Sequence, residues 1–227
     1  MKHILIPTRG PADWQRLLAS PTRHWRTGYS AKALAYCWEA ASGFPPEVTR
    51  ALDAAESPSL HGLELLLAIP EFEVSLPGGR APSCTDLFVL ARGPEGLVAI
   101  AVEGKVNEEF GPHVSHWLKG ASQGKKTRLA AIAEALGLKG FSLDVVRYQL
   151  LHRAASVIFA AQRFGASNAV LLVHSFSPSA AWFEDFAVFA ELLAARVTKN
   201  TVNRTEARTP IPLHLGWVTG ARRFLDA

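Results

Sequence analysis

Cysteine is scarce in this chain: Cys37 and Cys84 are the two among 227 residues. Their spacing forms neither the paired Cys-X-X-Cys pattern of a zinc site nor the framework of a disulfide-rich secreted domain, so we expect a reducing compartment. Long apolar runs are lacking as well, which argues against a membrane-spanning helix, and the apolar segment within residues 1–7 is too short for a signal peptide. These absences predict a cytoplasmic protein with no membrane partner.

Neither sign of charge dominates. The chain has 24 lysines and arginines against 20 acidic residues, a net charge of +4 and a pI of about 9.3, which suits a polyanionic partner without requiring one. With 48% hydrophobic and 19% charged residues the composition is ordinary for a globular protein. We expect a helical extension over residues 1–56, packed on an α/β core over residues 57–227.

Apolar periodicity and turn residues predict the elements around that core. Helices are expected over 30–41, 46–55, 57–69, 129–136, 142–164 and 180–196. Strands are expected over 71–76, 168–176 and 213–219, and the continuously apolar segment 168–176 is typical of a strand buried on both faces. This order indicates an α/β sandwich around a mixed sheet.

The segment from Asp86 to Lys105 is predicted to be a β-hairpin, since two apolar arms flank a Gly-Pro-Glu-Gly turn at 93–96. A symmetric turn places Asp86 opposite Glu103, and strand alternation places Glu103 and Lys105 on one face. Facing carboxylates repel each other, and a divalent cation such as Mg²⁺ would relieve the repulsion. Alternatively, the polar face is simply solvated and Lys105 pairs with one of the acids.

These residues resemble the PD-(D/E)XK, or restriction-endonuclease-like, nuclease superfamily, in which an Asp heads one strand and Glu-X-Lys lies near the end of the next. Glu103-Gly104-Lys105 matches the second half, whereas Thr85 stands where a Pro is usual before Asp86. The resemblance covers residues 57–176 and implies a restriction-endonuclease-like mixed sheet flanked by helices. It also implies metal-dependent hydrolysis of phosphodiester bonds in nucleic acid, with DNA as the expected substrate.

The resemblance further implies roles for individual residues. Asp86 and Glu103 would bind Mg²⁺ or Mn²⁺, and Lys105 would assist the attacking water. Gln149, on the predicted helix 142–164, would support the site, and Arg153, one turn later, would hold a phosphate or a carboxylate. Glu64, on the helix predicted over 57–69, is either a further metal ligand or an exposed residue.

Two basic segments are candidates for contact with nucleic acid. Lys125 and Lys126 belong to a run that could meet a phosphate backbone or form a solvated helix face. The segment from Arg23 to Tyr29 mixes cations with aromatic rings, which could stack on bases or pack the N-terminal helices together.

The main alternative function is a non-catalytic nucleic-acid-binding or protein-interaction module on the same fold, because a fold implies an activity only weakly. A hydrolase built on Cys84 is disfavoured because the sequence places no base beside this thiol. One built on His174 with Ser175 is disfavoured because neighbouring side chains on a strand point to opposite faces. A homodimer is left open.

Overall fold

The computed structural model describes residues 9–227, and the opening segment, in which no signal peptide is expected, lies outside the described residues. Six strands form one mixed sheet in the order β1-β2-β3-β4-β6-β5. Their bounds are β1 (Glu64–Val74), β2 (Ser83–Gly93), β3 (Gly96–Lys105), β4 (Asn168–Ser175), β5 (Thr201–Arg204) and β6 (Leu213–Thr219). β3, β4 and β6 run parallel, and the other neighbours pair antiparallel.

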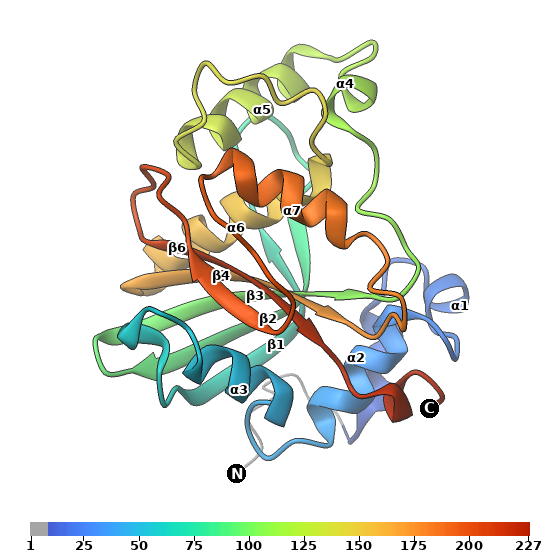
Figure 1. Cartoon of the computed structure of the whole chain (residues 1–227). Coiled ribbons are helices and arrows are strands. Elements are labelled where there is room, and N and C mark those ends of the chain that lie inside the picture. The colour runs from blue at the N-terminus through green and yellow to red at the C-terminus, as the bar shows by residue number, and fades with distance from the viewer. Residues whose placement is uncertain (1–8) are drawn as a thin grey trace.

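Helices cover both faces of the sheet (Figure 1). The α-helices are α1 (Pro21–His24), α2 (Ser30–Glu39), α3 (Pro46–Asp53), α4 (Val114–Trp117), α5 (Gln123–Ala135), α6 (Tyr148–Phe164) and α7 (Phe183–Leu192). Short 3₁₀ helices are η1 (Pro11–Leu17), η2 (Pro58–Leu60) and η3 (Arg222–Phe224). The predicted mixed α/β sheet flanked by helices is confirmed. No helix within residues 9–227 is both long and apolar enough to cross a membrane.

The sheet separates two apolar layers. On one face α6 and α7 cover the sheet, and the ring of Phe164 of α6 stacks on that of Phe88 of β2 with their centres 5.3 Å apart. On the other face Leu34 of α2, Leu52 of α3 and Ile100 of β3 belong to one buried apolar layer. Both faces of the central strands are therefore covered, and β4 is buried along its whole length, as expected for residues 168–176. The N-terminal helices therefore belong to one of the two layers that cover the sheet.

The prediction of a helix over residues 57–69 is wrong. Only the single turn η2 is helical, and from Glu64 onward the chain pairs with β2 along eleven residues. Leu65, Leu66 and Leu67 favour a helix by intrinsic propensity, but strand pairing and burial against the sheet override that preference. A register irregularity between Leu65 and Leu67 interrupts the simple alternation that would have indicated a strand.

Other boundaries also differ from expectation, among them the start of α5, which is Gln123 and not residue 129. The helix predicted over 142–164 begins only at Tyr148, because the preceding residues form a loop that bridges to His113 through Arg147. The polar segment before residue 208 contains β5, an edge strand four residues long that the sequence pattern did not indicate. Its weak pattern fits an edge position, where one side of the strand faces solvent.

Candidate active site

Three carboxylates lie on three adjacent strands. In the hairpin Arg92 lies opposite Leu97, as predicted. The same register, continued one residue beyond the last pair at Leu87, places Asp86 opposite Glu103. On β1, the residues on either side of Glu71 pair with the residues on either side of Asp86, so Glu71 extends the row. All three line one cleft of about 550 Å³, together with Lys105.

Glu71 is the site residue that the sequence did not identify. The sequence predicts Glu71 only as the first residue of a strand and does not indicate which strand lies beside it. Its backbone has a φ of 50°, a left-handed conformation that is uncommon for a residue other than glycine. Such strain is retained where the surrounding structure holds it, often at functional sites. Glu71 Oε2 accepts a hydrogen bond from the Cys84 thiol at 3.2 Å.

Glu103 is the most densely bonded side chain of the cleft. Its Oε1 accepts hydrogen bonds from Lys105 Nζ at 2.8 Å and from Gln149 Nε2 at 2.7 Å, and its Oε2 accepts from Arg153 Nε at 2.6 Å. Glu103 and Lys105 are only 2% and 4% exposed. The alternative of a simply solvated polar face is therefore wrong, because α6 covers this part of the hairpin, but the pairing of Lys105 with one of the acids is confirmed.

Asp86 is less completely paired. Its Oδ2 accepts a hydrogen bond from the backbone N–H of Gly104 at 2.9 Å, and its Oδ1 lies 3.9 Å from the guanidinium of Arg153. Burial and the neighbouring negative charge of Glu103 raise the pKa of Asp86 to about 8, although Arg153 opposes the shift. Burial and Glu103 also raise the pKa of Glu71. The row thus carries more negative charge than its cations balance.

The pKa of Glu103 is shifted in the opposite direction. Burial alone would raise it, but Arg153 and Lys105 outweigh burial and hold the pKa at about 2. Because this pKa lies below the ordinary value of about 4.3, Glu103 stabilises the fold above about pH 4.3, and that contribution is lost as the pH falls through 2. We expect the carboxyl ¹³C resonance of Glu103 to report an ionised group down to about pH 2. Titration at its ordinary value would contradict this arrangement.

The profile of the family described as "Domain of unknown function (DUF6946)" matches residues 7–222. The chain belongs to this family. Neither the curated proteins nor the solved structures contained a match.

Not every residue predicted from the sequence reaches the cleft of the DUF6946 chain. Glu64 lies opposite Arg92 at the far end of β1, and the two side chains form an exposed ion pair at 3.5 Å. Arg92 is six residues along β2 from Asp86, so Glu64 lies roughly 20 Å from the carboxylate row. The structure therefore does not bring Glu64 to the other acids, because the segment is a strand and its register carries Glu71 there instead.

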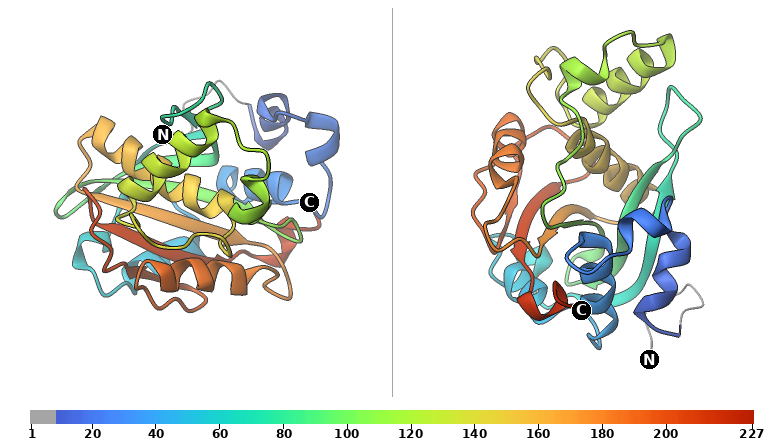
Figure 2. Two further views of the ribbon diagram at one scale, coloured as in Figure 1. Left: turned by 90° about the horizontal axis from the view of Figure 1, so that it is seen from above. Right: turned by 90° about the vertical axis from the view of Figure 1, so that its right-hand side faces the viewer.

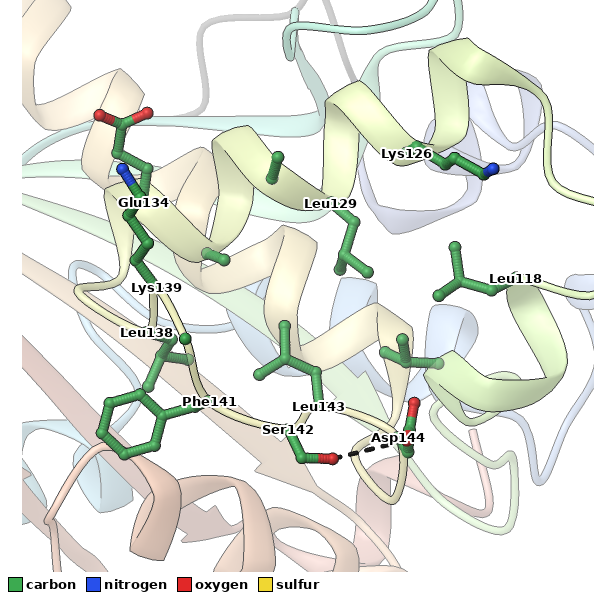
Figure 3. A pocket seen from close by; sticks show the side chains of 14 residues that line it. Leu118, Lys126, Leu129, Glu134, Leu138, Lys139, Phe141, Ser142, Leu143 and Asp144 are labelled. Carbon is green, nitrogen blue, oxygen red and sulfur yellow. Dashed lines mark hydrogen bonds between the residues drawn. The ribbon is translucent and has the colours of Figure 1, made fainter.

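The predicted substrate-binding lysines also lie outside the cleft lining. Lys125 Nζ donates to the backbone oxygen of Trp117 at 3.1 Å and lies 4.9 Å from the centre of its ring. Lys126 lines a different hollow of about 570 Å³, bordered by α4, α5 and the loop that follows α5. Figure 3 shows Lys126 at the edge of this largely apolar hollow, near Leu118 and Leu129. Neither lysine is therefore among the residues that line the carboxylate cleft.

Arg153 of the DUF6946 chain does reach the site, although it is nine-tenths buried. Besides Glu103 it contacts Ser83, whose hydroxyl oxygen accepts from the guanidinium at 3.2 Å. Of the two predicted roles, holding a phosphate or holding a carboxylate, the geometry shows the second.

A separate cluster lies on the opposite face of the sheet. Ligand atoms of Cys37, Glu47 and His174 all lie within 4.8 Å of one another, a spacing that a metal ion could use. The indole N–H of Trp38, however, donates to Nδ1 of His174 at 3.2 Å, so Nε2 carries the proton of the neutral ring. That nitrogen lies 3.4 Å from the Glu47 carboxylate, which also accepts from the Cys37 thiol at 3.6 Å. Nδ1 of His174 is therefore an acceptor, whereas a metal-bound histidine uses its other nitrogen as a donor, so this hydrogen-bond pattern does not favour a metal ion at the cluster.

Proposed function

We propose that the DUF6946 chain is a metal-dependent nuclease that hydrolyses phosphodiester bonds of nucleic acid, most of all DNA, in the carboxylate cleft. The observation that carries the proposal is the convergence of Glu71, Asp86 and Glu103 from three adjacent strands beside Lys105. Oxygen ligands of this kind suit Mg²⁺ or Mn²⁺, which are commonly held by one or two carboxylates and by substrate phosphate. The resemblance to PD-(D/E)XK nucleases supports the same assignment.

The charge of the cleft fits a bound divalent cation. Within the carboxylate row, three carboxylates face two buried cations, Lys105 and Arg153, and both cations are bound to Glu103. Asp86 and Glu71 are therefore the carboxylates left with unbalanced charge, and they are the ligands that we propose for the metal, beside Glu103. When bound, such an ion supplies a polarised water and offsets charge on the phosphoryl oxygens.

We propose that Lys105 acts on the phosphate. Two of its three ammonium hydrogens are used, since Nζ donates to Glu103 and, at 3.3 Å, to Oε1 of Gln149. Nζ also lies 4.8 Å from the centre of the Phe110 ring, and we propose that its third hydrogen meets a water or phosphate oxygen in the cleft. Gln149 donates to Glu103 and accepts from Lys105, and thus holds both side chains in one orientation. A donor fixed in this way stabilises negative charge that develops at the phosphate.

A specific observation favours a second candidate, the non-catalytic nucleic-acid-binding module. The guanidinium of Arg153 lies 2.6 Å from Glu103 and 3.9 Å from Asp86, so a protein cation already joins the two carboxylates. In that case the row would be an internal ion-pair network, and the cleft would bind nucleic acid without cutting it.

Cleavage assays separate the two candidates. We expect the protein to cleave plasmid or single-stranded DNA with Mg²⁺ or Mn²⁺, and Lys105→Gln to slow cleavage by about 100-fold or more, because a fixed donor to the phosphate is lost. Lys139→Gln, which removes an exposed lysine outside the cleft lining, should leave the rate nearly unchanged. Binding of DNA without any cleavage in the unaltered protein would instead identify the module.

We also propose the cytoplasm as its location. Cys37 and Cys84 are both free thiols, as expected in a reducing compartment.

A further inference from the structure

One side of the carboxylate cleft is formed by the N-terminal segment. Leu18 and Ala19 follow η1, Arg23 and His24 belong to α1, and Tyr29 directly precedes α2, and all of them line the cleft that contains Asp86. Figure 2 shows these N-terminal elements gathered beside α2 at the end of the sheet. Glu108 holds this segment in place, because its carboxylate accepts hydrogen bonds from the backbone N–H and the hydroxyl of Ser30, each at 2.9 Å.

The basic side chains of the cleft divide into two groups. Lys105 and Arg153 are buried and bound to Glu103. Arg23 and His24 are exposed, and neither forms an ion pair with another residue of the described range 9–227. They are therefore the cleft-lining groups whose hydrogen-bond donors remain available to a ligand.

An aromatic ring completes this side of the cleft. Tyr29 is 38% exposed, one of four large hydrophobic side chains in the described range with substantial exposure. An exposed ring beside available cations is the combination with which proteins hold single strands, because bases stack on the ring while cations meet the backbone. A base inside a duplex is already stacked on its neighbours, so its faces are not available to such a ring.

We propose that Arg23, His24 and Tyr29 form a binding wall for an unpaired strand of nucleic acid. Tyr29 stacks on a base next to the bond to be cut, and Arg23 and His24 bind the neighbouring phosphates opposite the carboxylate row. The wall makes single-stranded nucleic acid the preferred substrate. This inference rests on the proposed nuclease function, and it assigns the N-terminal segment to recognition and the hairpin to chemistry.

Binding can be measured separately from cleavage by using fluorescence anisotropy of a labelled oligodeoxythymidine, with Ca²⁺ in place of Mg²⁺ to prevent turnover. We expect Tyr29→Ala to weaken binding by about 5- to 100-fold, whereas Tyr29→Phe, which keeps the stacking face, binds nearly as well as the unaltered protein. Arg23→Ala should weaken binding and reduce the slope of log affinity against log salt by about 0.7, as expected when one phosphate contact of a single strand is lost.

Arg163→Ala is the matched control, because Arg163 is an exposed arginine on α6 that does not line the cleft. Circular dichroism establishes that each variant is folded. Equal affinity for single strand and duplex, or equal binding by Tyr29→Ala and Arg163→Ala in a protein that cleaves DNA, would overturn the wall and leave the nuclease in place. A protein that neither binds nor cleaves any nucleic acid would overturn both proposals.

Discussion

Glu103→Gln is expected to lower the free energy of unfolding by about 3–5 kcal/mol, because it leaves two buried cations without their carboxylate. Lys105 and Arg153 donate to opposite oxygens of Glu103, and all three side chains are less than a tenth exposed. Removing one partner of a buried ion pair costs more than the pair contributes, since the remaining charges stay away from water. Urea-induced unfolding with an unchanged slope against denaturant measures the difference.

The matched control is Glu64→Gln, which breaks an ion pair whose side chains are 63% and 64% exposed. That change should alter stability by less than about 1 kcal/mol, because solvent screens an exposed pair. A double variant, Glu103→Leu with Arg153→Leu, should lose less unfolding free energy than the two single variants lose in sum, since both charges leave the interior together. A loss for Glu103→Gln no larger than that for Glu64→Gln would show that Glu103 does not organise the site.

Much of the site could be predicted because it depends on local geometry. The Gly-Pro-Glu-Gly turn determines the register of the hairpin, and strand alternation then places Glu103 and Lys105 on one face. Gln149 and Arg153 are four residues apart on a helix, so both reach the same neighbour, which is Glu103. Each of these relations spans few residues and follows from the period of one element.

The remainder depended on contacts between distant segments. Glu71 could not be placed, because its position in the row depends on the pairing of β1 with β2, and the leucines of β1 favoured a helix. Arg23 and Tyr29 lie more than fifty residues before the hairpin, and only the packing of α2 on the sheet brings them to the cleft. The burial of Arg153 likewise follows from the position of α6 over the hairpin and not from its own sequence.

Asp86→Asn is expected to abolish metal-dependent cleavage, by about a thousand-fold, while leaving the protein folded. The carboxylate row has one carboxylate more than its buried cations balance, and Asp86 is the acid whose ionisation is disfavoured without a further cation, as its pKa of about 8 indicates. Loss of a ligand that holds the metal removes several kcal/mol of transition-state stabilisation, which corresponds to this reduction in rate.

The same substitution should change how stability depends on pH. Because the pKa of Asp86 lies above its ordinary value of about 3.9, the folded state binds the proton more tightly than the unfolded state does. Its contribution to stability is present below about pH 3.9 and is lost as the pH rises toward 8. Asp86→Asn cannot ionise, so the variant should not show this loss, and at about pH 8 it should equal or exceed the unaltered protein in stability.

Metal binding connects these two effects. An ion bound between Asp86 and Glu71 favours the ionised carboxylates, so MgCl₂ should raise the melting temperature of the unaltered protein, most of all near pH 8, and should leave that of Asp86→Asn unchanged. Asp144→Asn, which alters a residue of the separate apolar hollow, should retain the full response. If Asp86→Asn responds to MgCl₂ as the unaltered protein does, the metal is not held by this row. Arg153 is then the cation that balances the carboxylates of the row.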